Sequence, residues 1–334
     1  MIRRSIASMA GLGALVAAGL AVPSAAGAAP DPASAPVERT AVSTAAQERA
    51  GTYWTPERMR RAQDADVLVR DAARREASDS SDRAVAQGAP TVVGGRTAAP
   101  RPKRQADVDG GLYSGGGTVA RTTGKVFFTL AGSDYVCSGS STQAANESLV
   151  QTAGHCLNEG PGDFATNFTF VPAYDRGSAP YGQFAATELL TTTQWADQGD
   201  LDYDVGYAVV GPSGGRTLAD AVGAQGVGFN LARGAYTYAF GYPAAAPYDG
   251  EELAWCHGTV AQDTYGGSQD QGLVCDMTGG SSGGPWFSGY DETTGLGTLT
   301  SVNSFKYNLG PQRDRMFGPY LGSVVQAVYQ QAQG

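Results

Sequence analysis

The chain has 334 residues, and its 32 acidic side chains outnumber the 23 basic ones, which gives a formal net charge of -9. Nucleic acids and anionic membranes are bound by cationic surfaces, so this composition argues against either as a partner of the mature protein. The length would allow two domains, although all-β barrels of about 200 to 250 residues often form one unit.

Residues 1–29 have the layout of a secretory signal peptide. Two arginines precede an apolar stretch from Ile6 to Val22, and small residues follow at 26–28. A membrane anchor is the alternative, but serine and glycine dilute the stretch and no basic stop-transfer cluster follows it. We therefore expect a secreted, extracellular protein with no membrane contact after signal removal.

Residues 30–104 differ from the rest of the chain in charge and apolar content. Residues 1–104 hold 15 basic and 10 acidic side chains, whereas the remainder holds 8 and 22. Few large apolar residues are available for a core. One helix is predicted, capped by Thr55 and running from Pro56 to about Glu76. We interpret residues 30–104 as a propeptide, cleaved near Arg104, whose basic charge would attract the acidic body.

Residues 105–334 change to short apolar or alternating runs separated by glycine, asparagine, aspartate and serine. Such runs predict many short strands and hence an all-β barrel or sandwich. One helix is expected at about 319–331, where apolar residues recur at helical spacing. The helix-forming positions are Leu321, Val324, Val325 and Val328.

The chain has four cysteines. In an exported protein these predict two disulfides, for which three pairings are possible. We expect Cys137 to pair with Cys156, and Cys256 with Cys275. A zinc site is disfavoured because the cysteines are widely spaced and no Cys-x-x-Cys pair occurs.

Three segments supply a base, a carboxylate and a nucleophile in that order. They are Thr152-Ala153-Gly154-His155-Cys156, Asp202-Tyr203-Asp204-Val205-Gly206 and Gly280-Ser281-Ser282-Gly283-Gly284-Pro285. A serine hydroxyl becomes a good nucleophile when an imidazole removes its proton, and a carboxylate fixes the tautomer of that imidazole. The same order excludes the α/β-hydrolases, in which the serine comes first and the histidine last.

The segments around His155 and Ser282 resemble the chymotrypsin family of serine endopeptidases. Because Ser281 replaces the aspartate of the trypsin-like branch, the chain looks closer to the bacterial glutamyl endopeptidases. The resemblance implies two antiparallel six-stranded β-barrels, at about 112–215 and 222–315, a closing helix and a site between the barrels. It also makes activation by a trypsin-style amino terminus doubtful, so that the propeptide is the better candidate for control.

The resemblance also implies the site residues. His155 deprotonates Ser282, Asp204 orients His155, and the N–H groups of Gly280 and Ser282 form the oxyanion hole. Asp204 is favoured over Asp202 because a buried strand follows it directly. No cofactor is required.

The specificity pocket is predicted less sharply. Asp276 lies six residues before the serine, where trypsin-like members carry an acidic pocket floor, but glutamyl-type members can have aspartate there too. Ser304 and Phe305 resemble the family's strand that pairs with substrate. Asn303 stands where glutamyl endopeptidases have histidine, and Lys306 replaces a glycine, so neither specificity is predicted.

These features predict a secreted, monomeric serine endopeptidase that acts on polypeptides and is made as a proenzyme. The first alternative is an inactive binding module on the same fold, which retention of all three triad residues disfavours. The second is a secreted esterase, because the same acyl-enzyme chemistry would cleave esters.

Overall fold

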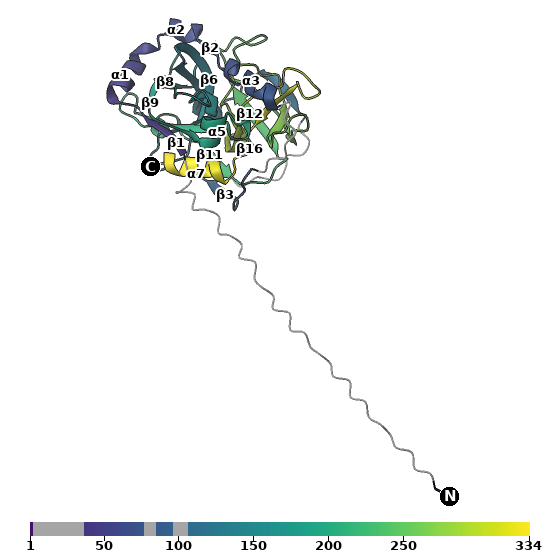
Figure 1. The fold of residues 1–334 in the computed structure, drawn as a ribbon. Helices are drawn as coiled ribbons and strands as arrows, with labels where there is room; N and C mark the ends of the chain where they lie inside the picture. Colours follow the sequence, from purple (N-terminus) through teal and green to yellow (C-terminus); the bar gives the residue numbers. More distant parts are fainter. Residues whose placement is uncertain (3–36, 77–84, 96–105) are drawn as a thin grey trace. The chain divides into compact units, whose positions relative to one another are not determined.

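The computed structural model describes residues 1–2, 37–76, 85–95 and 106–334. The predicted signal peptide and the predicted cleavage position near Arg104 lie outside these residues. None of the described helices is long and apolar enough to span a membrane. In Figure 1 strands β6, β8 and β9 lie in one half of the protein and β12 and β16 in the other.

We call residues 106–334 the body, and its first half is a closed six-stranded barrel. Its antiparallel ladder follows the order β9-β10-β7-β6-β5-β8 and returns to β9. The barrel is filled by large side chains such as Phe170 and Phe184, both fully buried. Its strands are β5 Thr123–Leu130, β6 Ser133–Thr142, β7 Leu149–Thr152, β8 Thr166–Pro172, β9 Phe184–Thr192 and β10 Gly206–Val210.

The six main strands of the second half are divided between two sheets and do not form one continuous ladder. Ladders join β13 to β12, β12 to β16, β16 to β17, and β15 to β18. The disulfide between Cys256 and Cys275 ties β13 to the end of β15. At the other seam Gly318 approaches β17 so closely that a Cβ would lie 2.2 Å from the Val302 oxygen. The strands are β12 Tyr236–Gly241, β13 Ala254–Thr259, β15 Gln271–Val274, β16 Pro285–Asp291, β17 Leu296–Val302 and β18 Arg315–Gly318.

Short elements complete the body. The fold is all-β with a C-terminal helix, as predicted, but α7 begins at Ser323 rather than near Pro319, because the Pro319 oxygen accepts a hydrogen bond from Ser301 Oγ. One pairing differs from the antiparallel expectation, since β11 runs parallel to β17. The remaining elements are β4 Val108–Leu112, α4 Gly117–Thr122, η2 Gly154–Cys156, α5 Thr193–Gln198, η3 Leu201–Tyr203, α6 Leu218–Val222, β11 Gly226–Phe229, β14 Ala261–Gln262 and α7 Ser323–Ala332.

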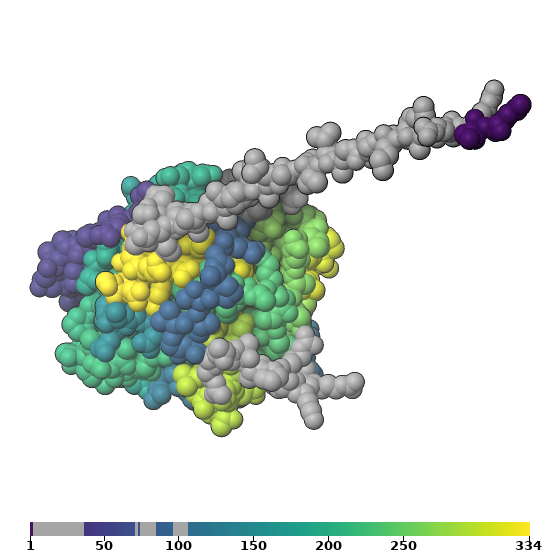
Figure 2. Space-filling view, turned by 90° about the horizontal axis from the view of Figure 1, so that it is seen from below, coloured from purple at the N-terminus to yellow at the C-terminus, as the bar shows by residue number. Residues whose placement is uncertain are grey.

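The leader, as we call residues 37–95, adds to the edges of the body. Strand β1 pairs with β9, β2 runs parallel to β6, and β3 pairs with β11. Figure 2 shows the part around β3 beside the yellow α7, where Ser323 N–H donates to the Ala86 oxygen. Its described elements are β1 Val37–Ala41, α1 Thr44–Tyr53, α2 Pro56–Arg61, β2 Gln63–Asp64, α3 Asp66–Glu76 and β3 Thr91–Val93.

The single helix predicted from Pro56 to Glu76 is two helices in the structure. Thr55 caps the first, as predicted, by accepting from the Arg58 N–H. The chain then leaves the helix at Ala62, because β2 extends along the edge of β6 before α3 begins at Asp66. The break brings Asp66, the first residue of α3, to Ser282.

Candidate active site

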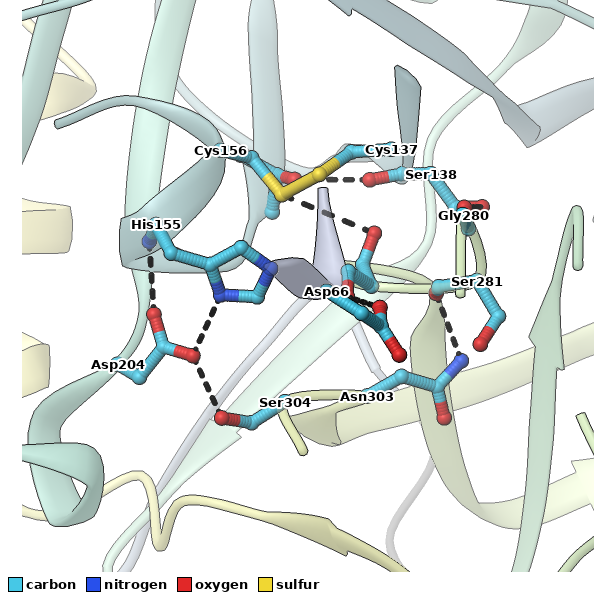
Figure 3. The surroundings of a disulfide bond; sticks show 12 residues. Asp66, Cys137, Ser138, His155, Cys156, Asp204, Gly280, Ser281, Asn303 and Ser304 are labelled. Carbon is cyan, nitrogen blue, oxygen red and sulfur yellow. Dashed lines mark hydrogen bonds and ion pairs between the residues drawn. A yellow bond between two sulfur atoms is a disulfide. The ribbon is translucent and has the colours of Figure 1, made fainter. Parts of the chain in front are cut away.

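His155 lies in the 3-10 turn η2, directly after β7. The next residue, Cys156, forms a disulfide with Cys137 on β6, so the turn is fastened to the neighbouring strand. Figure 3 shows this disulfide above the imidazole. A covalent tie of this kind limits movement of the ring relative to the barrel.

Asp204 holds His155 at two points. Its Oδ2 lies 2.8 Å from Nδ1 of His155, and its Oδ1 accepts from the backbone N–H of the same residue, also at 2.8 Å. Both side chains are fully buried. Ser304 Oγ donates to Oδ2 of Asp204 as well. The carboxylate therefore places the proton on Nδ1 and leaves Nε2 as the basic atom of the neutral ring.

The structure distinguishes Asp204 from its rival Asp202. Asp202 Oδ1 accepts from the backbone N–H of Gln269 at 2.6 Å, which directs its carboxylate to the second half of the body. Asp204 follows η3 as its C-cap residue and points at the imidazole. Thus the chain brings Asp204, and not Asp202, against His155.

The surroundings of His155 favour its protonated form. Burial acts to lower the pKa of His155, but the charge of Asp204, its hydrogen bond and the carboxylate of Asp66 act in the other direction and leave the pKa raised. An imidazole whose protonated form is stabilised by its surroundings is suited to general base work.

Ser282 sits in a tight turn that requires glycine. Gly280 has φ of +91° and Gly283 has φ of +78°. A Cβ on Gly283 would lie 2.0 Å from Thr152 Oγ1. Among the described residues, no acceptor is found for the backbone N–H of Gly280 or of Ser282. Two free N–H groups beside a serine can bind a developing oxyanion.

Ser281 and Asn303, which differ from the residues expected at their positions, form hydrogen bonds within the protein. Ser281 Oγ donates to the Thr278 oxygen within the same turn. Asn303 Nδ2 donates to the oxygens of Phe240 and Ser281, and Asn303 Oδ1 accepts from Trp286 Nε1 at 2.7 Å. Asn303 therefore holds the backbone at Ser281, next to Ser282, by a hydrogen bond.

Ser282 itself is bonded to the leader. Its Oγ donates to Oδ1 of Asp66, the first residue of α3, at 2.9 Å. Nε2 of His155 is buried and has no hydrogen-bond partner among the described residues. In Figure 3 Asp66 lies beyond the imidazole as seen from Asp204. Sequence reasoning missed Asp66, because nothing in the local sequence of a helix start indicates a distant serine.

A cavity of about 220 Å³ adjoins this contact, between α3 and the body. Lys306 lines it and donates from Nζ to the Cys275 oxygen at 2.7 Å. Burial lowers the pKa of Lys306, although Asp276, Asp66 and Asp314 act to raise it. The other body residues in the lining are Ala245, Met277, Thr278, Gly279, Phe305 and Asn308.

Of the three predicted substrate-binding residues, only Phe305 lines this cavity. The carboxylate of Asp276 accepts from Tyr248 at 2.5 Å and lies at the surface. Ser304 uses its hydroxyl to bond Asp204. Among the body residues that line the cavity, Lys306 is therefore the one with a charged side chain.

Two other groups have structural roles. Cys137, His155 and Cys156 lie close enough to bind a metal ion, but both sulfurs belong to the disulfide and are not free thiolates. His257, the second histidine, accepts or donates at Nδ1 with Tyr236 and stacks on Tyr238.

Solved proteases share this fold. The chain is 51% identical to protease Anisep from Arthrobacter nicotinovorans, with a TM-score of 0.62, covering 67% of this chain and 99% of that one. It is 47% identical to the thermostable serine protease AL20 from an extremophilic microorganism, with a TM-score of 0.61 and coverage of 65% and 98%. A Glu endopeptidase shares the fold at 16% identity, a TM-score of 0.52 and coverage of 69% and 98%.

Sequence comparison alone gives a shorter match. A stretch of 86 residues is 31% identical to the extracellular metalloprotease of Bacillus subtilis (strain 168), and the chain spans only 26% of that relative. No family profile matches the chain.

Proposed function

Because this chain belongs to the chymotrypsin-like family of serine proteases, we propose that it is a secreted endopeptidase, held inactive by its own leader until that leader is removed. The buried pair His155–Asp204 next to Ser282 is the strongest support for the catalytic part. The bond from Ser282 to Asp66 is the strongest support for inhibition.

In the proposed reaction His155 Nε2 takes the proton of Ser282 Oγ as the oxygen attacks a peptide carbonyl. The N–H groups of Gly280 and Ser282 stabilise the oxyanion, and Asp204 stabilises the imidazolium. His155 then gives its proton to the leaving amine. Water, activated by the same imidazole, hydrolyses the acyl-enzyme.

The leader opposes this reaction in two ways. The hydroxyl of Ser282 donates its hydrogen bond to the Asp66 carboxylate, and Nε2 of His155 has no hydrogen-bond partner among the described residues. The nucleophile and the base are therefore not hydrogen-bonded to each other. The apolar face of α3, with Val69 and Ala73, packs on the body beside the site. A substrate cannot occupy the same space. The body residues of that cluster are Trp195, Leu201, Phe305, Tyr307 and Phe317.

Two features of the chain support export. Both disulfides, Cys137–Cys156 and Cys256–Cys275, are typical of proteins that fold outside the reducing cytosol. The layout of residues 1–29 is that of a signal peptide. We place residues 30–104 as the propeptide and residues 105–334 as a monomeric protease acting on polypeptides.

The test compares the full chain with a chain that begins at Gln105. Circular dichroism establishes that both are folded, and a fluorophosphonate then reports the reactive serine. We expect strong labelling and peptide cleavage in the shorter form, weak labelling in the full chain, and neither in Ser282→Ala.

Each alternative has its own outcome in this experiment. A folded short form that is not labelled would indicate a binding module. Labelling with cleavage of esters but not of amides would indicate an esterase. Equal activity of the two forms would contradict inhibition by the leader and leave the protease assignment intact.

A further inference from the structure

A loop between β12 and β13 supports the segment before Ser282. We call residues 242–252 the support loop. Ala244 N–H donates to the Gly279 oxygen at 2.6 Å. Ala245 exchanges two hydrogen bonds with Thr278 Oγ1, at 3.1 and 2.8 Å. The loop is therefore hydrogen-bonded directly to the turn that carries the proposed oxyanion donors.

Close packing makes this support rigid. A Cβ on Gly280 would lie 2.9 Å from the Cβ of Ala244, and a Cβ on Gly250 would lie at the same distance from that atom. The Ala244 methyl group is thus enclosed between Gly250 and Gly280. The methyl group of Ala244 is close to both glycines, so a shift of Gly250 toward Ala244 would be passed on to Gly280.

Gly250 is in turn held from the opposite barrel. Lys125 on β5 donates from Nζ to the Gly250 oxygen at 2.8 Å. Its side chain is 3% exposed, and Nζ lies 4.5 Å from the centre of the Tyr174 ring. Tyr174 OH lies 3.1 Å from both carboxylate oxygens of Glu251, next in the loop. Two residues of the first barrel therefore fix one end of the support loop.

A buried lysine at this position opposes stability. Its neighbours along the strand, Val126, Phe127 and Phe128, are fully buried and apolar. Among the described residues, no carboxylate forms an ion pair with Lys125 within 4 Å. Burial lowers the pKa of Lys125 to about 8, although Glu251 and Asp249 act to raise it. Burial of a charge that no carboxylate contacts directly is costly, so a role beyond packing is indicated.

We propose that Lys125 is a positioning residue: through Gly250 and Ala244 it holds Gly280 in the conformation that directs its N–H at the oxyanion. The inference rests on the proposed function of the Ser282 turn. It assigns no contact between Lys125 and substrate.

The test uses Lys125→Met and Lys125→Ala, each made as the full chain and processed in the same way as the wild type. We expect kcat to fall by about 10- to 100-fold, the range for a misplaced catalytic group, while KM changes far less. Val126→Ala is the matched control, since it removes buried volume from the same strand without touching the support loop. It should lower the melting temperature with little effect on kcat.

Chemical rescue separates positioning from simple packing. Propylammonium matches the side-chain atoms that Lys125→Ala lacks, and it should restore kcat, whereas 1-propanol of the same size should not. Unchanged kcat in a folded Lys125→Met, or equal rescue by the alcohol, would overturn the proposal. A wild-type chain without serine-dependent hydrolysis would instead contradict the proposed function.

Discussion

The leader and the body bury their apolar side chains in different ways. The body, residues 106–334, fills its own interior with residues such as Phe170 and Phe184. The leader buries Trp54 against Phe127 of β5, and Val69 in a cluster with Phe305 of the body. Trp54 Nε1 also donates to the Asn167 oxygen at 2.6 Å. The large apolar side chains of the leader are therefore buried against the body.

Loss of Trp54 should have the largest effect on this dependence. Replacing a buried tryptophan by alanine costs about 3 to 5 kcal/mol. Here we expect the loss in the free energy with which the leader binds the body, because Trp54 belongs to the leader. A peptide of residues 37–76 carrying Trp54→Ala should therefore inhibit the mature enzyme far more weakly than the native peptide. Inhibition constants measure this difference.

Val67→Ala is the matched control for that experiment, since Val67 is exposed in α3. Its inhibition constant should stay close to that of the native peptide. If Trp54→Ala inhibits as well as Val67→Ala does, the leader is not held by the barrel.

Asp66→Ala should have the next largest effect. Removal of the hydrogen-bond partner of a buried group costs about 1 to 3 kcal/mol, so loss of the acceptor for Ser282 Oγ should weaken inhibition by about 10- to 100-fold. The uncleaved chain with this change should also react faster with a fluorophosphonate. Glu57→Gln, at an exposed ion pair on α2, is the control expected to change neither quantity. Unchanged labelling of Asp66→Ala would show that α3 inhibits by its bulk alone.

The strength of the leader's inhibition should depend on pH. Burial raises the pKa of Asp66 in the docked state, and the Asp66 charge in turn helps to raise the pKa of His155. Docking therefore takes up protons, so inhibition should be stronger at low pH and weaken as pH rises through the docked pKa values. Inhibition constants of the peptide between about pH 5 and pH 8 report this trend. Asp66→Asn should flatten it, and stronger inhibition at high pH would contradict the assignment.

Replacement of Lys306 should have the smallest effect, and only on the preference between acidic and basic substrates. Its ammonium lines the cavity beside Ser282 and is the body's charge there. Attraction of a partly solvated pair contributes about 1 kcal/mol, so peptides with an acidic residue before the scissile bond should be cleaved about fivefold faster than basic ones. Lys306→Met should remove the preference, and Arg121→Met, an exposed arginine on α4, should retain it. Values of kcat/KM for matched peptides decide between these outcomes.

Some features of the leader could be predicted from sequence and others could not. Thr55 and Pro56 indicate a helix start locally, because capping needs only neighbouring residues. The break at Ala62 depends on the edge of β6, more than 70 residues away in the chain. The contact of Asp66 with Ser282 depends on the same docking and has no local signal.

For the body, the sequence by itself determined the class of protein, because His155, Asp204 and Ser282 stand in short segments whose order and flanking residues are specific. It also predicted the two disulfides present in the structure, Cys137–Cys156 and Cys256–Cys275. Only the tertiary structure decided which side chains share a space. It turned Asp202 to Gln269, left Asp276 at the surface, and brought Lys306 to the cavity. Side-chain direction depends on turns and partners that are distant in the chain, and those partners meet only when the barrels and the leader assemble.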